Sequence, residues 1–215
     1  MISEPVYVVS GYMRSGTSMM MKALEQGGMN ICYSKEKDRI LENRFAQGEY
    51  HPNPEGFFEL GPREFESPNF PSEYQGRLIK ALHWRLKLLP PYFYRVLFML
   101  RDPLEIKVSY LKMFRQRPPF VLEKYQEFVD ETLVLLARRG DMAVTTVWHH
   151  HMMENPRAVL ENLKSEGFPI TDCEQASKAV NPGLYRSKTT DLETVRQGIP
   201  GLRTDLPSFL KKQSS

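Results

Sequence analysis

The feature that most constrains the fold is an apolar, strand-like run that leads through a glycine-containing loop into a helix-like run. Residues 5–10 (PVYVVS) are short and rich in β-branched side chains, which indicates a buried strand. Residues 16–26 carry apolar side chains at helical spacing, and Gly27 and Gly28 end that pattern. A strand, a tight loop and a helix in this order are typical of the start of an α/β protein.

The rest of the chain continues this alternation. Further strands are predicted at residues 77–82, 94–100 and 142–148, and further helices at residues 103–114, 121–139 and 155–165. Strands joined by helices require right-handed crossovers and a mostly parallel sheet. At 215 residues the chain is long enough for one such domain. We therefore predict a three-layer α/β/α fold with a mostly parallel central sheet, in a single domain spanning residues 1–215.

Residues 30–76 interrupt the alternation. Five prolines between residues 52 and 71 break regular structure. Aromatic residues supply apolar area, among them Phe45, Tyr50, Phe57, Phe58, Phe65, Phe70 and Tyr74. Loops of this length are usually functional or disordered. The segment is either a packed cover over the core or a lid that faces a ligand, and the sequence leaves both open.

Charge and cysteine content narrow the functional classes. There are 29 Lys and Arg residues against 26 Asp and Glu residues, a net charge of +3 that is too small to predict nucleic-acid binding. Cys32 and Cys173 form no CxxC pair, which favours a reducing compartment. No apolar run approaches the roughly 20 residues that span a bilayer, and the first strand begins too early for a signal peptide. We expect a cytoplasmic protein without a membrane or nucleic-acid partner, of unknown oligomeric state.

The loop after the first strand, residues 11–18 (GYMRSGTS), has the glycine spacing and the terminal hydroxyl pair of a P-loop. Gly11 permits a sharp turn, and Gly16 lets the backbone approach an anion. Backbone N–H groups at the start of the following helix can then hold phosphate oxygens, aided by the helix dipole. The sequence thus predicts a P-loop nucleotide-binding fold.

One position departs from the P-loop of nucleotide hydrolases. Where those proteins have a lysine that reaches the β- and γ-phosphates, this chain has Thr17. The cation stands three positions earlier, at Arg14, whose guanidinium can form two hydrogen bonds to an anionic group. A triphosphate hydrolase with this loop would lack its main positive charge.

With these residues the loop resembles that of the sulfotransferase family, whose form [KR]-S-G-T-[ST] is matched by Arg14, Ser15, Gly16, Thr17 and Ser18. In that family the loop binds the 5′-phosphosulfate of 3′-phosphoadenosine 5′-phosphosulfate, and the soluble bacterial and cytosolic members are the most similar to this chain. The resemblance implies a sulfotransferase that moves a sulfuryl group in line onto a hydroxyl of a small-molecule or glycan acceptor. It also implies adenosine 3′,5′-bisphosphate as the product and no need for a metal ion.

Two later segments extend the resemblance. Arg101 follows an apolar strand and Ser109 stands eight positions on, which is similar to the family's 3′-phosphate motif. An arginine at the carboxyl end of a strand points into the crevice where α/β proteins bind ligands. Residues 181–186 (NPGLYR) resemble a late family segment whose cation approaches the same phosphate. The resemblance thus implies that Tyr185 and Arg186 also belong to the cofactor site.

The resemblance also implies the catalytic residues. Residues 78–90 (LIKALHWRLKLLP) resemble a family segment in which the lysine, here Lys80, stabilises the transferring group and a histidine two positions later is the general base. In this chain His83 stands three positions after Lys80, and a single step along a strand turns a side chain to the opposite face.

A second segment offers a rival base. Residues 53–59 (NPEGFFE) resemble a bacterial sulfotransferase segment close to the acceptor, which would make residues 30–76 a lid or an acceptor-side insertion. A carboxylate flanked by two phenylalanines suits the abstraction of a hydroxyl proton. Glu59 is therefore preferred over His83 as the base, and both remain candidates.

Three adjacent histidines, residues 149–151, follow the predicted strand at 142–148. Neighbouring residues on a strand point to opposite faces, so the three side chains cannot converge on one metal ion without a turn. We interpret them as the end of a strand that runs into a loop and predict no metal site.

Two other functional classes remain open. A P-loop kinase or nucleotide hydrolase would share the strand, loop and helix, although Thr17 argues against it. A nucleotide-binding module of the same fold without catalysis remains open because His83 is out of register with the family's base.

Overall fold

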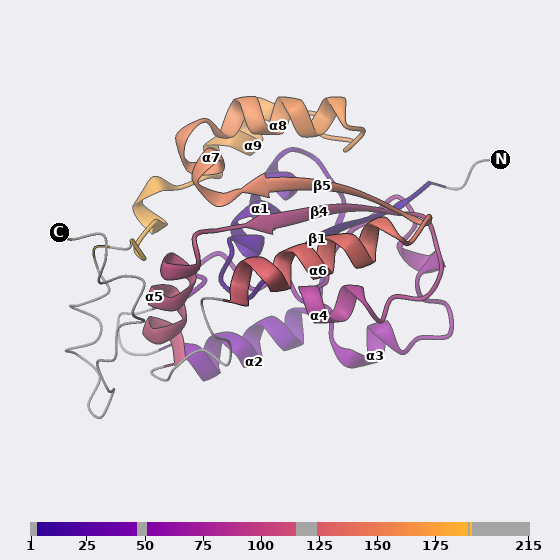
Figure 1. Ribbon diagram of the computed structural model, residues 1–215, viewed down its shortest axis with the longest axis horizontal. Coiled ribbons are helices and arrows are strands. Elements are labelled where there is room, and N and C mark those ends of the chain that lie inside the picture. The colour runs from indigo at the N-terminus through magenta and orange to yellow at the C-terminus, as the bar shows by residue number, and fades with distance from the viewer. Residues whose placement is uncertain (1–3, 47–50, 115–123, 189, 191–215) are drawn as a thin grey trace.

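The computed structural model describes residues 4–46, 51–114, 124–188 and 190 (Figure 1). Tyr50 and the first three residues of the helix predicted at 121–139 lie outside the described residues.

A parallel sheet forms the centre of the molecule. Its strands are β1 (Val6–Gly11), β2 (Ile31–Cys32), β3 (Leu78–Lys80), β4 (Tyr94–Leu100) and β5 (Met142–Trp148). They lie in the order β2-β3-β1-β4-β5, and every pairing in the described part of the chain is parallel. In the centre Val8 of β1 lies between Ile79 and Val96. The predicted α/β fold with a mostly parallel sheet is confirmed.

Helices cover both faces of this sheet (Figure 1). On one face lie α1 (Thr17–Gln26), α7 (His149–Glu154), α8 (Pro156–Ser165) and α9 (Cys173–Lys178). On the other lie α4 (His83–Leu86), α5 (Pro103–Phe114) and α6 (Tyr125–Ala137). The remaining helices are α2 (Lys35–Phe45), α3 (Pro62–Phe65) and the short 3-10 helices η1 (Ser72–Tyr74) and η3 (Pro182–Leu184).

Side chains alternate along β1 between these two layers. Val6 and Val8 pack toward α6, whereas Tyr7 and Val9 pack toward α1. Successive residues of a strand point to opposite faces, so a strand buried on both sides is apolar throughout, as residues 6–9 are.

The order of the strands decides where a ligand can bind. The chain goes from β1 to the edge strand β2, returns to β3, and then crosses β1 to reach β4 and β5. Ligands in such sheets bind beyond the carboxyl ends of the strands, at the point where the direction of winding reverses. That point lies at the loop after β1, between the ends of β3 and β4.

The structure corrects the prediction for residues 30–76. This segment contains the edge strand β2 and the eleven-residue helix α2, where no regular element was predicted. The side chain of Ser34 caps α2 by accepting a hydrogen bond from the Lys37 amide (3.3 Å). Because α2 has no buried residue and is mostly charged, it lacks the apolar stripe by which a helix is recognised.

The interpretation of the three histidines as a strand end that runs into a loop is wrong. Strand β5 ends at Trp148, and helix α7 begins at once with His149. On a helix the three side chains point in different directions around the axis, because successive residues are about 100° apart. His149 is buried, whereas His150 and His151 are exposed.

No described helix is both long enough and apolar enough to cross a membrane.

Candidate functional site

The P-loop begins where β1 ends and continues into the first turn of α1. Gly16 is the N-cap residue of α1, with a φ of 99°, and no side chain caps this helix end. The first amide groups of the helix therefore have no intrahelical acceptor and face the place where an anion would bind. The Ser15 hydroxyl is buried and has no hydrogen-bond partner among the described residues. The uncapped helix end suits a bound anionic group.

Arg14 projects from this loop in a strained conformation, with a φ of 70°. Its Nε donates a hydrogen bond to the Ser109 hydroxyl of α5 (2.9 Å). Its Nη1 donates to Asn53 Oδ1 (3.0 Å) and its Nη2 to the Pro52 carbonyl (3.1 Å). One guanidinium therefore connects the P-loop, α5 and the segment that contains residues 52 and 53.

Arg101 lies directly after β4 and is buried. Its Nε donates to the Glu105 carboxylate (2.9 Å), its Nη1 to the Arg14 carbonyl (2.9 Å) and its Nη2 to the Ser187 carbonyl (3.2 Å). The Tyr185 hydroxyl also donates to Glu105. The two predicted arginines are thus adjacent, and the Arg101 side chain contacts the backbone of Arg14.

Lys80 ends β3 and points toward the P-loop. Its Nζ donates hydrogen bonds to the Ser18 hydroxyl (3.0 Å) and the Phe57 carbonyl (2.7 Å). Burial lowers the pKa of Lys80 to about 8, while the nearby Glu59 carboxylate acts in the opposite direction. Lys80 is therefore an ammonium that loses its proton more readily than an exposed lysine.

Glu59 lies between two lysines. One carboxylate oxygen is 3.0 Å from Lys37 Nζ and the other is 3.7 Å from Lys80 Nζ. The Asp38 carboxylate accepts hydrogen bonds from the amides of residues 57, 58 and 59 at 3.0, 3.1 and 3.4 Å. Helix α2 thus fixes the segment that carries Glu59 and supplies one of the cations that pair with it.

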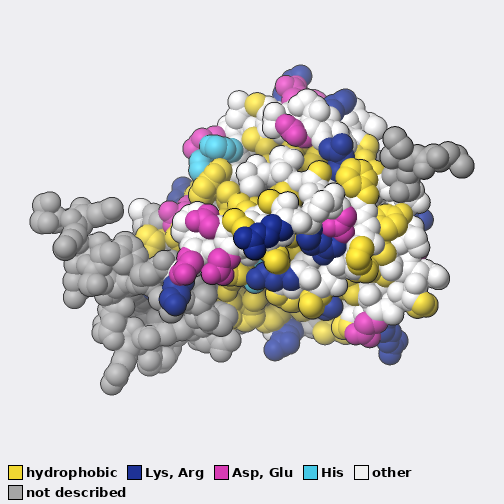
Figure 2. Space-filling model, turned by 45° about the vertical axis from the view of Figure 1, so that its right-hand side comes forward, with side chains coloured by type: hydrophobic (Ala, Val, Ile, Leu, Met, Phe, Trp, Pro, Cys, Tyr) yellow, Lys and Arg dark blue, Asp and Glu magenta, His cyan; other side chains and the backbone are white. Residues whose placement is uncertain are grey.

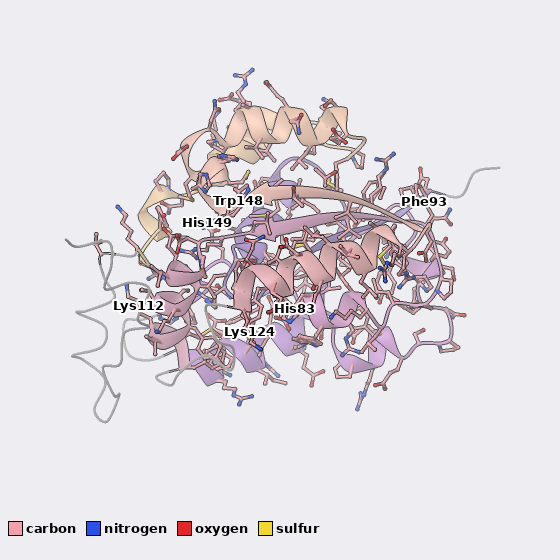
Figure 3. The ribbon with its side chains drawn as sticks, viewed as in Figure 1. His83, Phe93, Lys112, Lys124, Trp148 and His149 are labelled. Atoms are coloured by element: carbon pink, nitrogen blue, oxygen red, sulfur yellow. The ribbon has the colours of Figure 1, made fainter. Side chains whose placement is uncertain are left out.

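His83 lies away from these groups. It is the first residue of α4, and its ring stacks on Tyr12 (4.8 Å between centroids) and contacts Phe128 edge-on (4.7 Å). Burial lowers its pKa to about 4. In Figure 3 it lies on the α6 side of the sheet. Strand β3 ends at Lys80, and it is Leu82, two positions after Lys80, that lines the cavity described next.

Most of the predicted site residues line one cavity of about 340 Å³. Those that line it are Arg14, Gly16, Thr17, Ser18, Glu59, Lys80, Arg101, Tyr185 and Arg186. Ser15 and Ser109 are buried just behind this lining, and His83 is not part of it. Among the described residues the lining holds five Lys and Arg side chains against two carboxylates, so the cavity favours anions.

On the face shown in Figure 2, Lys and Arg side chains lie singly or in small groups beside Asp and Glu side chains. Within the described part of the chain, no group of three or more His, Cys, Asp or Glu side chains is placed to hold a metal ion.

Comparisons with known proteins find structural similarity at low sequence identity. No protein-family model matches the chain, and no curated protein matches it. A solved sulfotransferase from Alicyclobacillus acidocaldarius is similar at 15% identity, over 95% of this chain and 98% of that one, with a TM-score of 0.41. An unliganded sugar kinase from Janibacter sp. HTCC2649 is similar at 13% identity, over 84% of this chain and 98% of that one, with a TM-score of 0.37. The chemistry of this chain must therefore come from its own residues.

His149 is a cavity residue that sequence reasoning missed. Its ring lies against Gly16, where an added Cβ would be only 2.6 Å from His149 Cδ2, and it packs against Tyr185 (5.2 Å between centroids). Burial, followed by the positive charge of Arg101, lowers the pKa of His149 to about 3, so the imidazole is neutral. Its Nδ1 has no hydrogen-bond partner among the described residues. The signal in the sequence was its position directly after a parallel strand.

Lys37 and Asp38 were also missed. Both come from α2, the helix that the sequence pattern did not reveal. No local signal links them to Glu59, because the contact spans about twenty residues and depends on how the segment after α2 folds back.

Proposed function

We propose that this protein is a sulfotransferase that transfers a sulfuryl group from 3′-phosphoadenosine 5′-phosphosulfate to a hydroxyl acceptor. The observation that carries the proposal is the direct contact of Arg101 with the Arg14 carbonyl at the edge of one cationic cavity. Two arginines from separate loops suit a nucleotide that carries anionic groups on two ribose carbons, whereas a P-loop that lacks its lysine suits a triphosphate poorly.

The residues of the donor half divide into two groups. The uncapped amides of α1 and the Arg14 guanidinium are placed to bind the 5′-phosphosulfate. Arg101 supplies a buried guanidinium for the 3′-phosphate, and Ser109 holds the Arg14 side chain in place. Tyr185 and Arg186 also line the cavity, and the Tyr185 ring lies beside the Arg101 guanidinium.

The reacting half contains a base and a cation. The bound donor supplies the sulfuryl group, which gains a bond to the acceptor oxygen as its bond to the phosphate oxygen breaks. Glu59 is placed to accept the hydroxyl proton, since it lines the cavity and His83 does not. Lys80 lies beside both Ser18 and Glu59, where its ammonium offsets negative charge that develops on the phosphate.

One observation favours a second candidate, a P-loop kinase. The Lys80 ammonium, 3.0 Å from the Ser18 hydroxyl, places a positive charge beside the loop that Thr17 does not provide. Binding measurements separate the two candidates.

The test is titration of the protein with adenosine 3′,5′-bisphosphate, ADP and ATP, each with and without Mg²⁺, by calorimetry. Because the 3′-phosphate adds charge-assisted hydrogen bonds, we expect the bisphosphate to bind about tenfold to 100-fold more tightly than ADP, without Mg²⁺. Tight binding of MgATP with no binding of the bisphosphate would replace the sulfotransferase by the kinase.

Lys80 gives a prediction for the dependence of turnover on pH. With its pKa near 8 in the ligand-free protein, Lys80 loses its charge as the pH rises, so kcat/KM for the donor should fall on the alkaline side with an apparent pKa close to 8. In Lys80→Arg the side chain stays charged, and the alkaline fall should disappear even if kcat/KM is lower throughout.

The control for this prediction is the stability of the folded protein over the same pH range. The pKa of Lys80 in the folded protein is below the usual 10.5, so the unfolded chain binds more protons between about pH 8 and 10.5. The contribution of Lys80 to the free energy of unfolding therefore rises with pH in this range. Melting temperatures measured beside the rates separate unfolding from the loss of this charge, and an unchanged alkaline fall in Lys80→Arg would assign it to another group.

A further inference from the structure

The part of the cavity beyond Glu59 and Lys80 has a different character from the donor half. Three elements form it: α2, the segment of residues 52–57, and the last turns of α5. Its apolar lining residues are Leu41, Phe45, Phe57, Tyr110, Met113 and Phe114. If the donor binds along the P-loop, this part of the cavity is the place for the acceptor.

Four rings in this part form a continuous aromatic wall, defined by Phe45, Phe57, Tyr110 and Phe114. The Phe45 ring contacts the ring of Phe57 (6.2 Å between centroids) and, edge-on, that of Phe114 (5.0 Å). Phe114 in turn stacks on Tyr110 (4.3 Å, 29° between planes). The rings come from three separate elements and all line the cavity, with Phe57 and Tyr110 nearly buried, so this side of the cavity is apolar and aromatic.

Several polar groups of the neighbouring segment are already used inside the protein. The Pro52 carbonyl and Asn53 Oδ1 accept hydrogen bonds from Arg14. The Phe57 carbonyl accepts from both Lys80 and Ser18, and the Phe57 amide donates to Asp38. These four groups are therefore not available to the hydroxyls of a sugar ring, and the other charged lining residues of this part, Arg44 and Glu55, lie at its exposed rim.

We infer that the acceptor is a hydroxyl compound with a flat apolar body, a phenol or a fused-ring alcohol, rather than a glycan. Its rings lie on the aromatic wall and its hydroxyl reaches Glu59. This inference rests on the proposed function and names its substrate class. A site built from rings and a single reacting end discriminates between acceptors by their apolar area.

The experiment supplies the full-length protein with 3′-phosphoadenosine 5′-phosphosulfate and, in parallel, with 2-naphthol, methyl glucoside or chitotriose. Sulfated products are measured by mass spectrometry and kinetic constants are determined. We expect 2-naphthol to be sulfated with a kcat/KM at least 100-fold above that of either sugar. In Phe45→Ala we expect the KM for 2-naphthol to rise about tenfold or more, and in Phe45→Leu by less.

The matched control is Phe93→Ala. Phe93 is 38% exposed and precedes β4 at the opposite end of the sheet, far from His149 (Figure 3). Its replacement removes a ring from the surface and should leave the KM unchanged. In all three variants the affinity for adenosine 3′,5′-bisphosphate should stay within about twofold of the parent, which shows that the donor half is folded.

Failure of the inference and failure of the proposed function give different results. Tight bisphosphate binding together with preferred sulfation of a sugar, or an unchanged 2-naphthol KM in Phe45→Ala, overturns the apolar acceptor and leaves the sulfotransferase standing. Absence of both bisphosphate binding and transfer to any acceptor overturns the proposed function and the acceptor site with it.

Discussion

Replacement of Arg101 by alanine is expected to weaken the binding of adenosine 3′,5′-bisphosphate by about 100-fold or more and to destabilise the fold as well. The loss of two charge-assisted hydrogen bonds to a phosphate accounts for the affinity, at about 1.5–3 kcal/mol each. Calorimetric titration of the variant beside the parent measures this effect, and an unchanged affinity would contradict the donor site.

The expected loss of stability in Arg101→Ala comes from the groups that lose their contacts with Arg101. The Glu105 carboxylate, whose side chain is 12% exposed, would lose its ion pair, and the Arg14 and Ser187 carbonyls would lose their donors. An unpaired buried charge of this kind costs about 3–5 kcal/mol. The double variant Arg101→Ala/Glu105→Gln removes that charge, so it should recover much of the melting temperature while the affinity stays low. Recovery of both would mean that Arg101 acts only through stability.

Replacement of Glu59 by glutamine is expected to lower kcat by about 100-fold to 10,000-fold, the usual contribution of a general base. The size of the side chain is kept, and its amide can still contact Lys37 and Lys80. Removal of a negative charge from a cavity that binds anions should leave the bisphosphate affinity unchanged or raise it. Steady-state rates and calorimetry on the same preparation measure both quantities.

Two variants control for this result. Glu73→Gln changes an exposed carboxylate of η1 and should behave as the parent. His83→Gln tests the rival base and should retain activity, because the imidazole packs against Tyr12 and Phe128 away from the cavity. An active Glu59→Gln protein, or a folded but inactive His83→Gln protein, would reverse the assignment of the base.

The sequence predicts the fold well where strands and helices have distinct apolar patterns. The predicted strands at 94–100 and 142–148 agree with β4 and β5, and the helix at 103–114 agrees with α5. These elements are apolar because they pack in the core, and burial is the property that sequence patterns reflect. Helix α2 escaped prediction for the converse reason, since it buries no residue and most of its side chains are charged.

The residues of the candidate site likewise include some that the sequence pattern reveals and some that it does not. Residues 14–18 were found because a strand, a glycine loop and a helix are contiguous in the sequence and fix each other locally. Lys37 and Asp38 were missed because their roles arise from a chain reversal after α2. His83 illustrates a third case, in which the short strand β3 ends before the histidine and a helix then turns it toward the aromatic core.

The Arg14 side chain has a consequence for how this protein could acquire a new specificity. It belongs to the loop that we propose binds the nucleotide, yet its two terminal nitrogens hold residues 52 and 53, which border the proposed acceptor pocket. Substitutions at residues 52 and 53 that admit another acceptor would shift the Arg14 guanidinium and so change the affinity for the nucleotide. Changes in acceptor specificity are therefore coupled to the affinity for the nucleotide. Substitutions beside Asn53 should require compensating substitutions in the P-loop.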